Sequence, residues 1–286
     1  MTRAVIDIGS NSVRLMVAED GKTLYKKLAV TRLGAGKDEK GNLSAVSIER
    51  AVFAVKDFVD IARKENSADI FAFATAAVRT AANGKDLTDK IKNVCGISVD
   101  IVSGEKEAEL GVLGALGGKD GGIVDVGGAS TEIAVFKGGK IIYSKSLNIG
   151  AVNLTEKFGQ DSKEISLFVS EKIKEYGNVP RADFYIIGGT AVTLAIVDKG
   201  LKKYDPAETD GHIVFAEKLK SIVKILSEQS PKEREVVSGV DKQRADIICS
   251  GAIIFYELIK YLGVNSFTVS ESDNAEGYLR YITGKL

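Results

Sequence analysis

The sequence predicts an α/β protein built from two duplicated halves. The turn pattern Asp-x-Gly-x-x-Ser occurs twice, with Asp7 and Asp125 lying 118 positions apart. The match continues beyond the turn, because AVIDIGSNSVRLMVAEDGKTLYKK aligns with GIVDVGGASTEIAVFKGGKIIYSK. A single Asp-Gly turn is ordinary in hairpins, but two aligned copies at domain spacing indicate duplication, and strand and helix patterns alternate through the rest of the chain. The expected domains are residues 1–117 and 118–286.

Each copy predicts three strands joined by two tight turns. The apolar runs 4–8 and 123–126 are typical of buried strands. Glycines and small residues in the first turn of each copy let a phosphate approach exposed backbone N–H groups. A neighbouring carboxylate, Asp7 or Asp125, would repel that anion unless a hard cation such as Mg²⁺ lies between them. Two such loops facing each other would hold a phosphate chain from two sides.

The remaining elements follow from periodicity and capping signals. Ser44 is a good N-cap for an amphipathic helix that reaches about residue 65, and Ser103 opens another that ends near residue 116. A Gly-rich stretch, 117–122, then makes a hinge between the halves. Further strands are expected at 69–74, 98–102, 184–187 and 267–269, and further helices at 87–94, 153–158, 163–176 and 242–262 and from about residues 191, 215 and 275.

Composition excludes several classes of protein. The 39 basic and 39 acidic residues balance, so nothing favours nucleic acid or an anionic membrane as a partner. Cys95 and Cys249 lie far apart and suggest neither a disulfide framework nor a zinc site. Without a leader-like segment or a long apolar run, the expected protein is soluble and cytoplasmic.

His212 is the only histidine and lies in a polar stretch that is typical of a surface loop. Its isolation argues against Ser-His-Asp and Cys-His catalysis and against a histidine-rich metal site. Catalysis is therefore expected from carboxylates, Lys, Arg or a metal ion.

Five motifs in order, AVIDIGSNSVRLMVAE, ATAAVRTAANG, IVSGEKEAELGVLGA, IVDVGGASTEIAVF and IIGGTAVTLA, resemble those of the exopolyphosphatase / guanosine pentaphosphate phosphatase family. That family belongs to the actin, sugar kinase and Hsp70 superfamily. The resemblance implies two ribonuclease H-like domains, each a mixed sheet flanked by helices, with a cleft between them. It also implies Mg²⁺-dependent hydrolysis of a terminal phosphoanhydride bond of inorganic polyphosphate, guanosine pentaphosphate or both.

The resemblance also implies residue roles. Glu107 falls on the catalytic glutamate and Arg79 on an arginine that would clamp a phosphate. Asp7, Asp125 and Glu132 would hold Mg²⁺. The phosphate-binding positions are Ser10, Asn11 and Ser12 in the first loop, Gly127, Gly128, Ala129 and Ser130 in the second, and Gly188, Gly189 and Thr190 in a third turn.

Structural interpretations stand beside these roles. Carboxylates at Glu105, Glu107 and Glu109 would also stabilise a helix start. Arg79 would serve equally as an exposed salt-bridge partner. The expected mechanism has Glu107 orient and deprotonate a water for in-line attack, while Arg79 and the loop N–H groups stabilise the phosphoryl oxygens.

Two departures from the family pattern leave alternatives open. Ala129 replaces a usual glycine, and Glu271 and Ala275 stand where Asp and Arg are usual. The altered C-terminal motif leaves open a non-catalytic binder of polyphosphate or alarmone, and the loops shared across the superfamily leave open an ATP-dependent kinase. A homodimer also stays open.

Overall fold

The computed structural model describes residues 1–237 and 239–284, and its first half is a five-stranded mixed sheet in the order β3-β2-β1-β4-β5. The three hairpin-linked strands are antiparallel, and β4 and β5 run parallel to β1. Their bounds are β1 Thr2–Ile8, β2 Ser12–Glu19, β3 Lys22–Val30, β4 Asp69–Ala74 and β5 Asp100–Ile101.

The second half repeats this order in a six-stranded sheet, β10-β11-β9-β6-β7-β8, in which β10 is an additional antiparallel edge strand. Strands β6, β7 and β8 form the hairpins, and β9 and β11 continue the sheet in parallel. Their bounds are β6 Gly121–Val126, β7 Thr131–Lys137, β8 Lys140–Leu147, β9 Phe184–Ile187, β10 Ile213–Phe215 and β11 Ser266–Val269.

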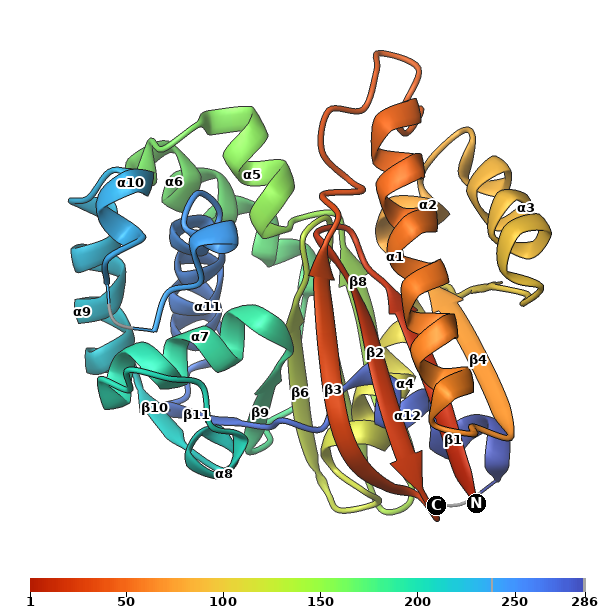
Figure 1. Ribbon diagram of the computed structural model, residues 1–286. Helices are drawn as coiled ribbons and strands as arrows, with labels where there is room; N and C mark the ends of the chain where they lie inside the picture. The colour runs from red at the N-terminus through yellow and green to blue at the C-terminus, as the bar shows by residue number, and fades with distance from the viewer. Residues whose placement is uncertain (238, 285–286) are drawn as a thin grey trace.

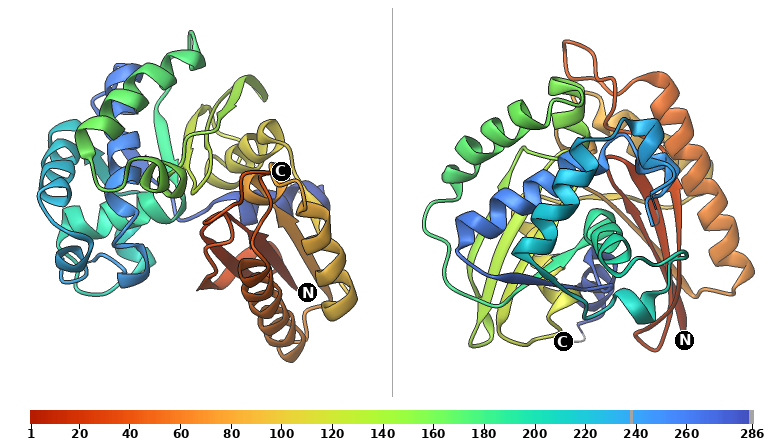
Figure 2. Two further views of the ribbon diagram at one scale, coloured as in Figure 1. Left: turned by 90° about the horizontal axis from the view of Figure 1, so that it is seen from above. Right: turned by 90° about the vertical axis from the view of Figure 1, so that its left-hand side faces the viewer.

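Helices cover the outer faces of both sheets (Figures 1 and 2). In the first half these are α1 (Ala45–Lys64), α2 (Ala76–Arg79) and α3 (Gly84–Cys95), and Ser44 caps α1 as expected. The second half carries α5 (Ala151–Phe158), α6 (Ser162–Lys172), η1 (Ile173–Tyr176), α7 (Gly188–Lys199), α8 (Pro206–Thr209), α9 (Ala216–Ser227), α10 (Pro231–Arg234), η2 (Lys242–Arg244) and α11 (Ile248–Leu262).

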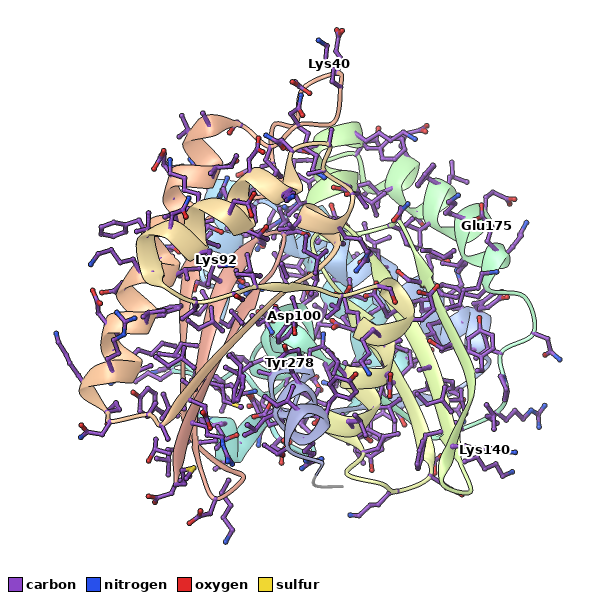
Figure 3. All side chains as sticks on the ribbon, turned by 90° about the vertical axis from the view of Figure 1, so that its right-hand side faces the viewer. Lys40, Lys92, Asp100, Lys140, Glu175 and Tyr278 are labelled. Carbon is purple, nitrogen blue, oxygen red and sulfur yellow. The ribbon has the colours of Figure 1, made fainter. Side chains whose placement is uncertain are left out.

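Two helices, α4 (Gly104–Ala115) and α12 (Asn274–Thr283), lie between the sheets. Leu110 of α4 and Leu279 of α12 pack against Val5 and Phe73 of the first sheet, while Val112 of α4 packs against the second. The ring of Tyr278 stacks on Phe73, and its hydroxyl binds Asp100, which lies beside it in Figure 3. The final helix of the chain is thereby held against the first sheet.

Strand alternation aims the charged residues inward. Ile6 and Ile8 join the core under α1, so Asp7 between them points to the opposite face, toward α4 and α12. The same alternation in β6 directs Val124 and Val126 to the outer core and Asp125 inward. Both aspartates therefore lie on the sheet faces that look toward each other.

The structure corrects several sequence expectations. The expected helix 242–262 is interrupted, because the short 3-10 turn η2 precedes α11, and this break directs Arg244 toward the interior. The Gly-rich stretch 117–122, expected to form a hinge, is only partly a connecting loop, since Gly121 and Gly122 are buried in β6. The histidine expected on the surface is partly buried, with His212 Nε2 lying 2.8 Å from Asp198 Oδ2.

Candidate functional site

The two duplicated turns have the same hydrogen-bonded geometry. The Gly9 amide donates to the Ser12 carbonyl at 3.0 Å, and the Gly127 amide donates to the Ser130 carbonyl at 3.0 Å. A Cβ atom at either glycine would lie 3.1 Å from that same carbonyl oxygen, so close approach favours glycine at both positions. The strand pairing shifts register at equivalent points as well, between Val17 and Ala18 and between Val135 and Phe136.

The two turns face each other across a narrow cleft. A Cβ atom at Gly128 of the second turn would lie 3.0 Å from Cβ of Ser10 and 3.4 Å from the amide of Asn11 in the first. The two turns therefore nearly touch at Gly128, and the cleft that both turns line opens beside this contact. The cleft is lined by Asp7, Gly9, Ser10, Asn11, Ser12, Arg14, Thr75, Ala76, Glu107, Asp125, Val126, Gly127, Gly128, Ser130, Ala151, Gly189, Thr190, Arg244, Ile247 and Asn274.

Three carboxylates from three elements converge at the base of this cleft. Glu107 comes from α4, Asp125 from β6 and Glu132 from β7, and one oxygen of each lies within 4.8 Å of the others. Asp125 and Glu132 are direct partners across the antiparallel pair. All three side chains are buried, and Glu132 is fully so. Three ionised carboxylates that lie this close together and are shielded from solvent repel one another unless they bind protons or a cation.

Burial shifts their titration accordingly. Burial raises the pKa of Glu107 to about 7, although the positive charge of Arg79 opposes this shift. Burial also raises the pKa of Asp125 to about 7, and repulsion from Glu107 adds to this shift. The pKa of Asp7 is also raised to about 7, chiefly by burial. Burial, with Glu107 and Asp125 nearby, raises the pKa of Glu132 well above its ordinary value.

The cluster fits a divalent cation. Within the described part of the chain, the buried Oε2 atom of Glu132 has no hydrogen-bond partner. The buried Oδ1 atom of Asp7 on the facing strand also has none, although Asp7 is not one of the three converging carboxylates. Carboxylate oxygens are the ligands that Mg²⁺ takes, and a bound cation would offset the mutual repulsion. Ser146 on β8 donates to Glu132 Oε1 at 2.6 Å and so fixes the orientation of that carboxylate.

Glu107 is held by capping and by an ion pair. The Ser103 side chain accepts from the Lys106 amide and caps α4 four residues before Glu107. Arg79, at the end of α2, places Nη1 2.8 Å from Glu107 Oε2 and 2.9 Å from the Val102 carbonyl oxygen. Of the three neighbouring glutamates, only Glu107 is buried, since Glu105 is exposed and Glu109 pairs with Lys106 on the surface.

Some expected site residues lie off the cleft wall. Glu132 is behind Asp125, and Arg79 is behind Glu107. Gly188 lines the neighbouring pocket instead. Ala129 is buried with its carbonyl turned to the Asn153 side chain, which donates to it at 3.0 Å.

Three cleft residues with charged or amide side chains were not predicted as site residues. Arg14 pairs with Asp7 across β1 and β2 and binds Asp273 at 3.1 Å. Arg244 is buried against Gly189, and a Cβ atom at Gly189 would lie 2.2 Å from Nη1 of Arg244. Among the described residues, no carboxylate forms an ion pair with Arg244. Burial and nearby Arg14 lower the pKa of Arg244 to about 10. The third residue, Asn274, donates to Asp125 Oδ2 at 2.8 Å.

The fold and the site together define a class: two-domain α/β proteins with paired Asp-x-Gly turns beside a buried carboxylate cluster. Residues 5–284 match the sequence model of a protein family described as the Ppx/GppA phosphatase family. The chain therefore belongs to that family.

Curated relatives agree with this assignment. The chain is 30% identical to the bifunctional 3-dehydroquinate synthase/phosphatase of Fusobacterium nucleatum, over 96% of this chain and 46% of the relative. It is 29% identical to exopolyphosphatase 2 of Mycobacterium tuberculosis, over 98% of each chain. It is 28% identical to the guanosine-5'-triphosphate,3'-diphosphate pyrophosphatase of Photobacterium profundum, over 99% of this chain and 59% of the relative.

Solved structures have the same fold. The Ppx/GppA family member of Aquifex aeolicus superposes with a TM-score of 0.83 at 30% identity, covering 100% of this chain and 98% of the other. A protein described as exopolyphosphatase-like gives a TM-score of 0.92 at 26% identity and covers 100% of both chains. These matches confirm the expected two-domain, actin-like α/β fold. Among the described residues, no helix has the length and apolarity to cross a bilayer.

Proposed function

We propose that this chain hydrolyses the terminal phosphoanhydride bond of inorganic polyphosphate or guanosine pentaphosphate in the presence of Mg²⁺ and releases orthophosphate. One observation carries the proposal: Glu107, Asp125 and Glu132 converge within 4.8 Å beside two equivalent phosphate-type turns. The exopolyphosphatase and pyrophosphatase names of two relatives support the same reaction class.

The turns would bind the terminal phosphoryl group. Ser10, Asn11 and Ser12 from one side and Gly127, Gly128 and Ser130 from the other line the cleft. Their backbone N–H groups and hydroxyls would donate to the equatorial oxygens, where negative charge lies in the transition state. Because the loops are fixed by their own hydrogen bonds, this arrangement requires little reorganisation during reaction.

Glu107 would orient a water and accept its proton. Its carboxylate lines the cleft, and the ion pair with Arg79 fixes its rotamer. A carboxyl group whose pKa is raised by burial to about 7 accepts a proton readily near neutral pH. Arg79 would act first by positioning Glu107, and a shift of its guanidinium into the cleft would be needed for it to clamp a phosphate.

Asp7, Asp125 and Glu132 would hold Mg²⁺. When bound, Mg²⁺ neutralises charge on the phosphate oxygens. Its ligands come from equivalent strands of the two halves, so the cation site would join the two domains at the base of the cleft.

The rest of the substrate would extend into an adjoining pocket of about 530 Å³. Arg14 and Arg244 line both spaces, and Lys26, Lys202 and Lys203 line the adjoining pocket together with Asp241, Glu271 and Asp273. Asp273 already binds Arg14 and Lys26, so Arg244, Lys202 and Lys203 are the cations that would meet the charges of polyphosphate. The apolar wall formed by Val192, Ile196 and Val240 offers a surface for the guanine base of guanosine pentaphosphate.

The test is orthophosphate release from each substrate, measured side by side with Mg²⁺ and with EDTA. The proposal expects release from at least one substrate, and EDTA should abolish it. Tight binding without release would favour a non-catalytic binder, and transfer of phosphate from ATP to a small molecule would favour a kinase. Either result would contradict hydrolysis.

A further inference from the structure

We propose that Asn274 is a positioning residue that orients the Asp125 carboxylate in the cation site, an inference that rests on the proposed Mg²⁺ dependence. Asn274 Nδ2 donates to Asp125 Oδ2 at 2.8 Å, and both side chains are buried. The two residues are 149 positions apart, so this bond joins the first residue of α12 to the end of β6. Asn274 also lines the phosphate cleft.

The segment that carries Asn274 is fixed from the first half of the chain. Asp273 caps α12 by accepting from the Ala275 amide at 3.0 Å, and Glu276 completes a reciprocal capping box. Arg14 and Lys26 bind Asp273 at 3.1 Å and 3.3 Å, and Lys26 also binds Glu276 at 2.9 Å. The start of α12 is therefore attached to β2 and β3, and Asn274 transmits that fixed position to Asp125.

The surroundings of the Asn274 side-chain amide favour its role as a hydrogen-bond donor to Asp125. A Cβ atom at Gly111 of α4 would lie 3.2 Å from Asn274 Oδ1, so glycine leaves room for the side chain there. That Oδ1 atom is buried and accepts no hydrogen bond from the described residues. A buried orphan acceptor destabilises the fold. The polar contribution of this amide is thus concentrated in its bond to Asp125.

A neutral donor is the chemistry that this position requires. Asp125 already lies beside Glu107 and Glu132, so another carboxylate at position 274 would add to the repulsion. An amide instead donates a hydrogen bond to one oxygen of Asp125 and so fixes the orientation of the carboxylate plane. Partners of metal-ligating groups typically control metal affinity or activity by about 10–100-fold.

The test measures Mn²⁺ binding to the full chain by electron paramagnetic resonance without substrate. We compare the wild type with Asn274→Leu, which removes the donor at similar volume, and Asn274→Ala, which removes the donor with a smaller side chain, so that neither variant adds a charge beside Asp125. Tyr278→Phe is the matched control, because it removes one side-chain hydrogen bond from the same helix, to Asp100, away from the cluster (Figure 3).

Both Asn274 variants should bind Mn²⁺ about 10–100-fold more weakly, while Tyr278→Phe should bind as the wild type does. Unchanged affinity in both Asn274 variants would overturn the inference and leave the proposed hydrolysis standing. Equal weakening in Tyr278→Phe would also overturn it, since the effect would then belong to α12 as a whole. If Asn274→Leu does not fold, Asn274→Ala decides, because it removes the donor without adding a charge. A wild type that binds no Mn²⁺ would overturn the inference together with the proposed cation dependence.

Discussion

Arg14 and Glu132 occupy the same position in the two duplicated hairpins and carry opposite charges. Each lies directly across an antiparallel pair from an inward-facing aspartate, Arg14 from Asp7 and Glu132 from Asp125. In the first half the aspartate therefore has a cationic neighbour, whereas in the second half it has a second acid. Duplication supplied the shared geometry, and this one difference concentrates negative charge at the base of the second hairpin.

Replacing Glu132 with Gln should stabilise the metal-free protein and impair cation binding. The pKa of Glu132 is raised by burial, so its ionised form opposes folding at pH values above its ordinary range. Glutamine keeps an acceptor for Ser146 and removes the buried charge. In EDTA at pH 8, urea unfolding should show a gain of about 1–3 kcal/mol. A loss of stability under these conditions would contradict the account.

Replacing Arg244 with Gln should raise KM for polyphosphate. A charge-assisted hydrogen bond contributes about 1.5–3 kcal/mol, which corresponds to roughly 10–100-fold in affinity. Gly189→Ala should produce a similar KM change with little loss of stability, because the new Cβ atom would displace the flexible guanidinium end of Arg244. Steady-state kinetics of the two single variants and the double variant check this. Additive effects in the double variant would show that the two residues act separately.

Asp273→Asn should remove an acid-sensitive contribution to stability. Although burial opposes ionisation, Lys26 and Arg14 hold the pKa of Asp273 at about 2, below its ordinary value of 3.8. A carboxylate whose pKa is lower in the folded than in the unfolded protein stabilises the fold above about pH 4. This stabilisation is lost as the pH falls from about 4 to 2. The Asn variant, which still caps α12, should be less stable by about 2 kcal/mol at pH 6. Urea unfolding across this range should show the difference shrinking with acid. A constant difference would contradict the assigned ion pairs.

Gly277→Ala should destabilise the protein although alanine favours helices. A Cβ atom at Gly277 would lie 1.8 Å from the Leu110 carbonyl oxygen, so α4 and α12 would have to separate. Overpacking of this kind typically costs about 1–3 kcal/mol, which exceeds the gain of about 1 kcal/mol in helix propensity. Thermal unfolding measures the balance. An unchanged or higher Tm would show that the two helices separate easily.

The hairpins, the capped helices and the inward direction of Asp7 and Asp125 were predictable because they depend on local signals. Period-two alternation fixes the face of each strand residue, and Ser44 and Ser103 mark helix starts directly. The family motifs then located Glu107 and the cleft loops.

Arg244 and Asn274 were not predictable from local pattern, because their roles depend on tertiary contacts across long stretches of chain. Asn274 meets Asp125 only after α12 folds back between the sheets, and Arg244 faces the cleft only because the helix expected at 242–262 is interrupted. The three-residue strand β10 was too short for its periodicity to distinguish it from a loop. The side-chain hydrogen bond between Asp198 and His212 likewise had no local signal.

The central claim is that Glu107 activates the attacking water, and phosphate release by Glu107→Gln tests it most directly. The matched control is Glu109→Gln, which changes a surface glutamate on the same helix. The account predicts that kcat falls about 10²–10⁴-fold in a Glu107→Gln variant that remains folded and is unaffected in Glu109→Gln. Turnover by Glu107→Gln equal to that of the wild type would contradict it.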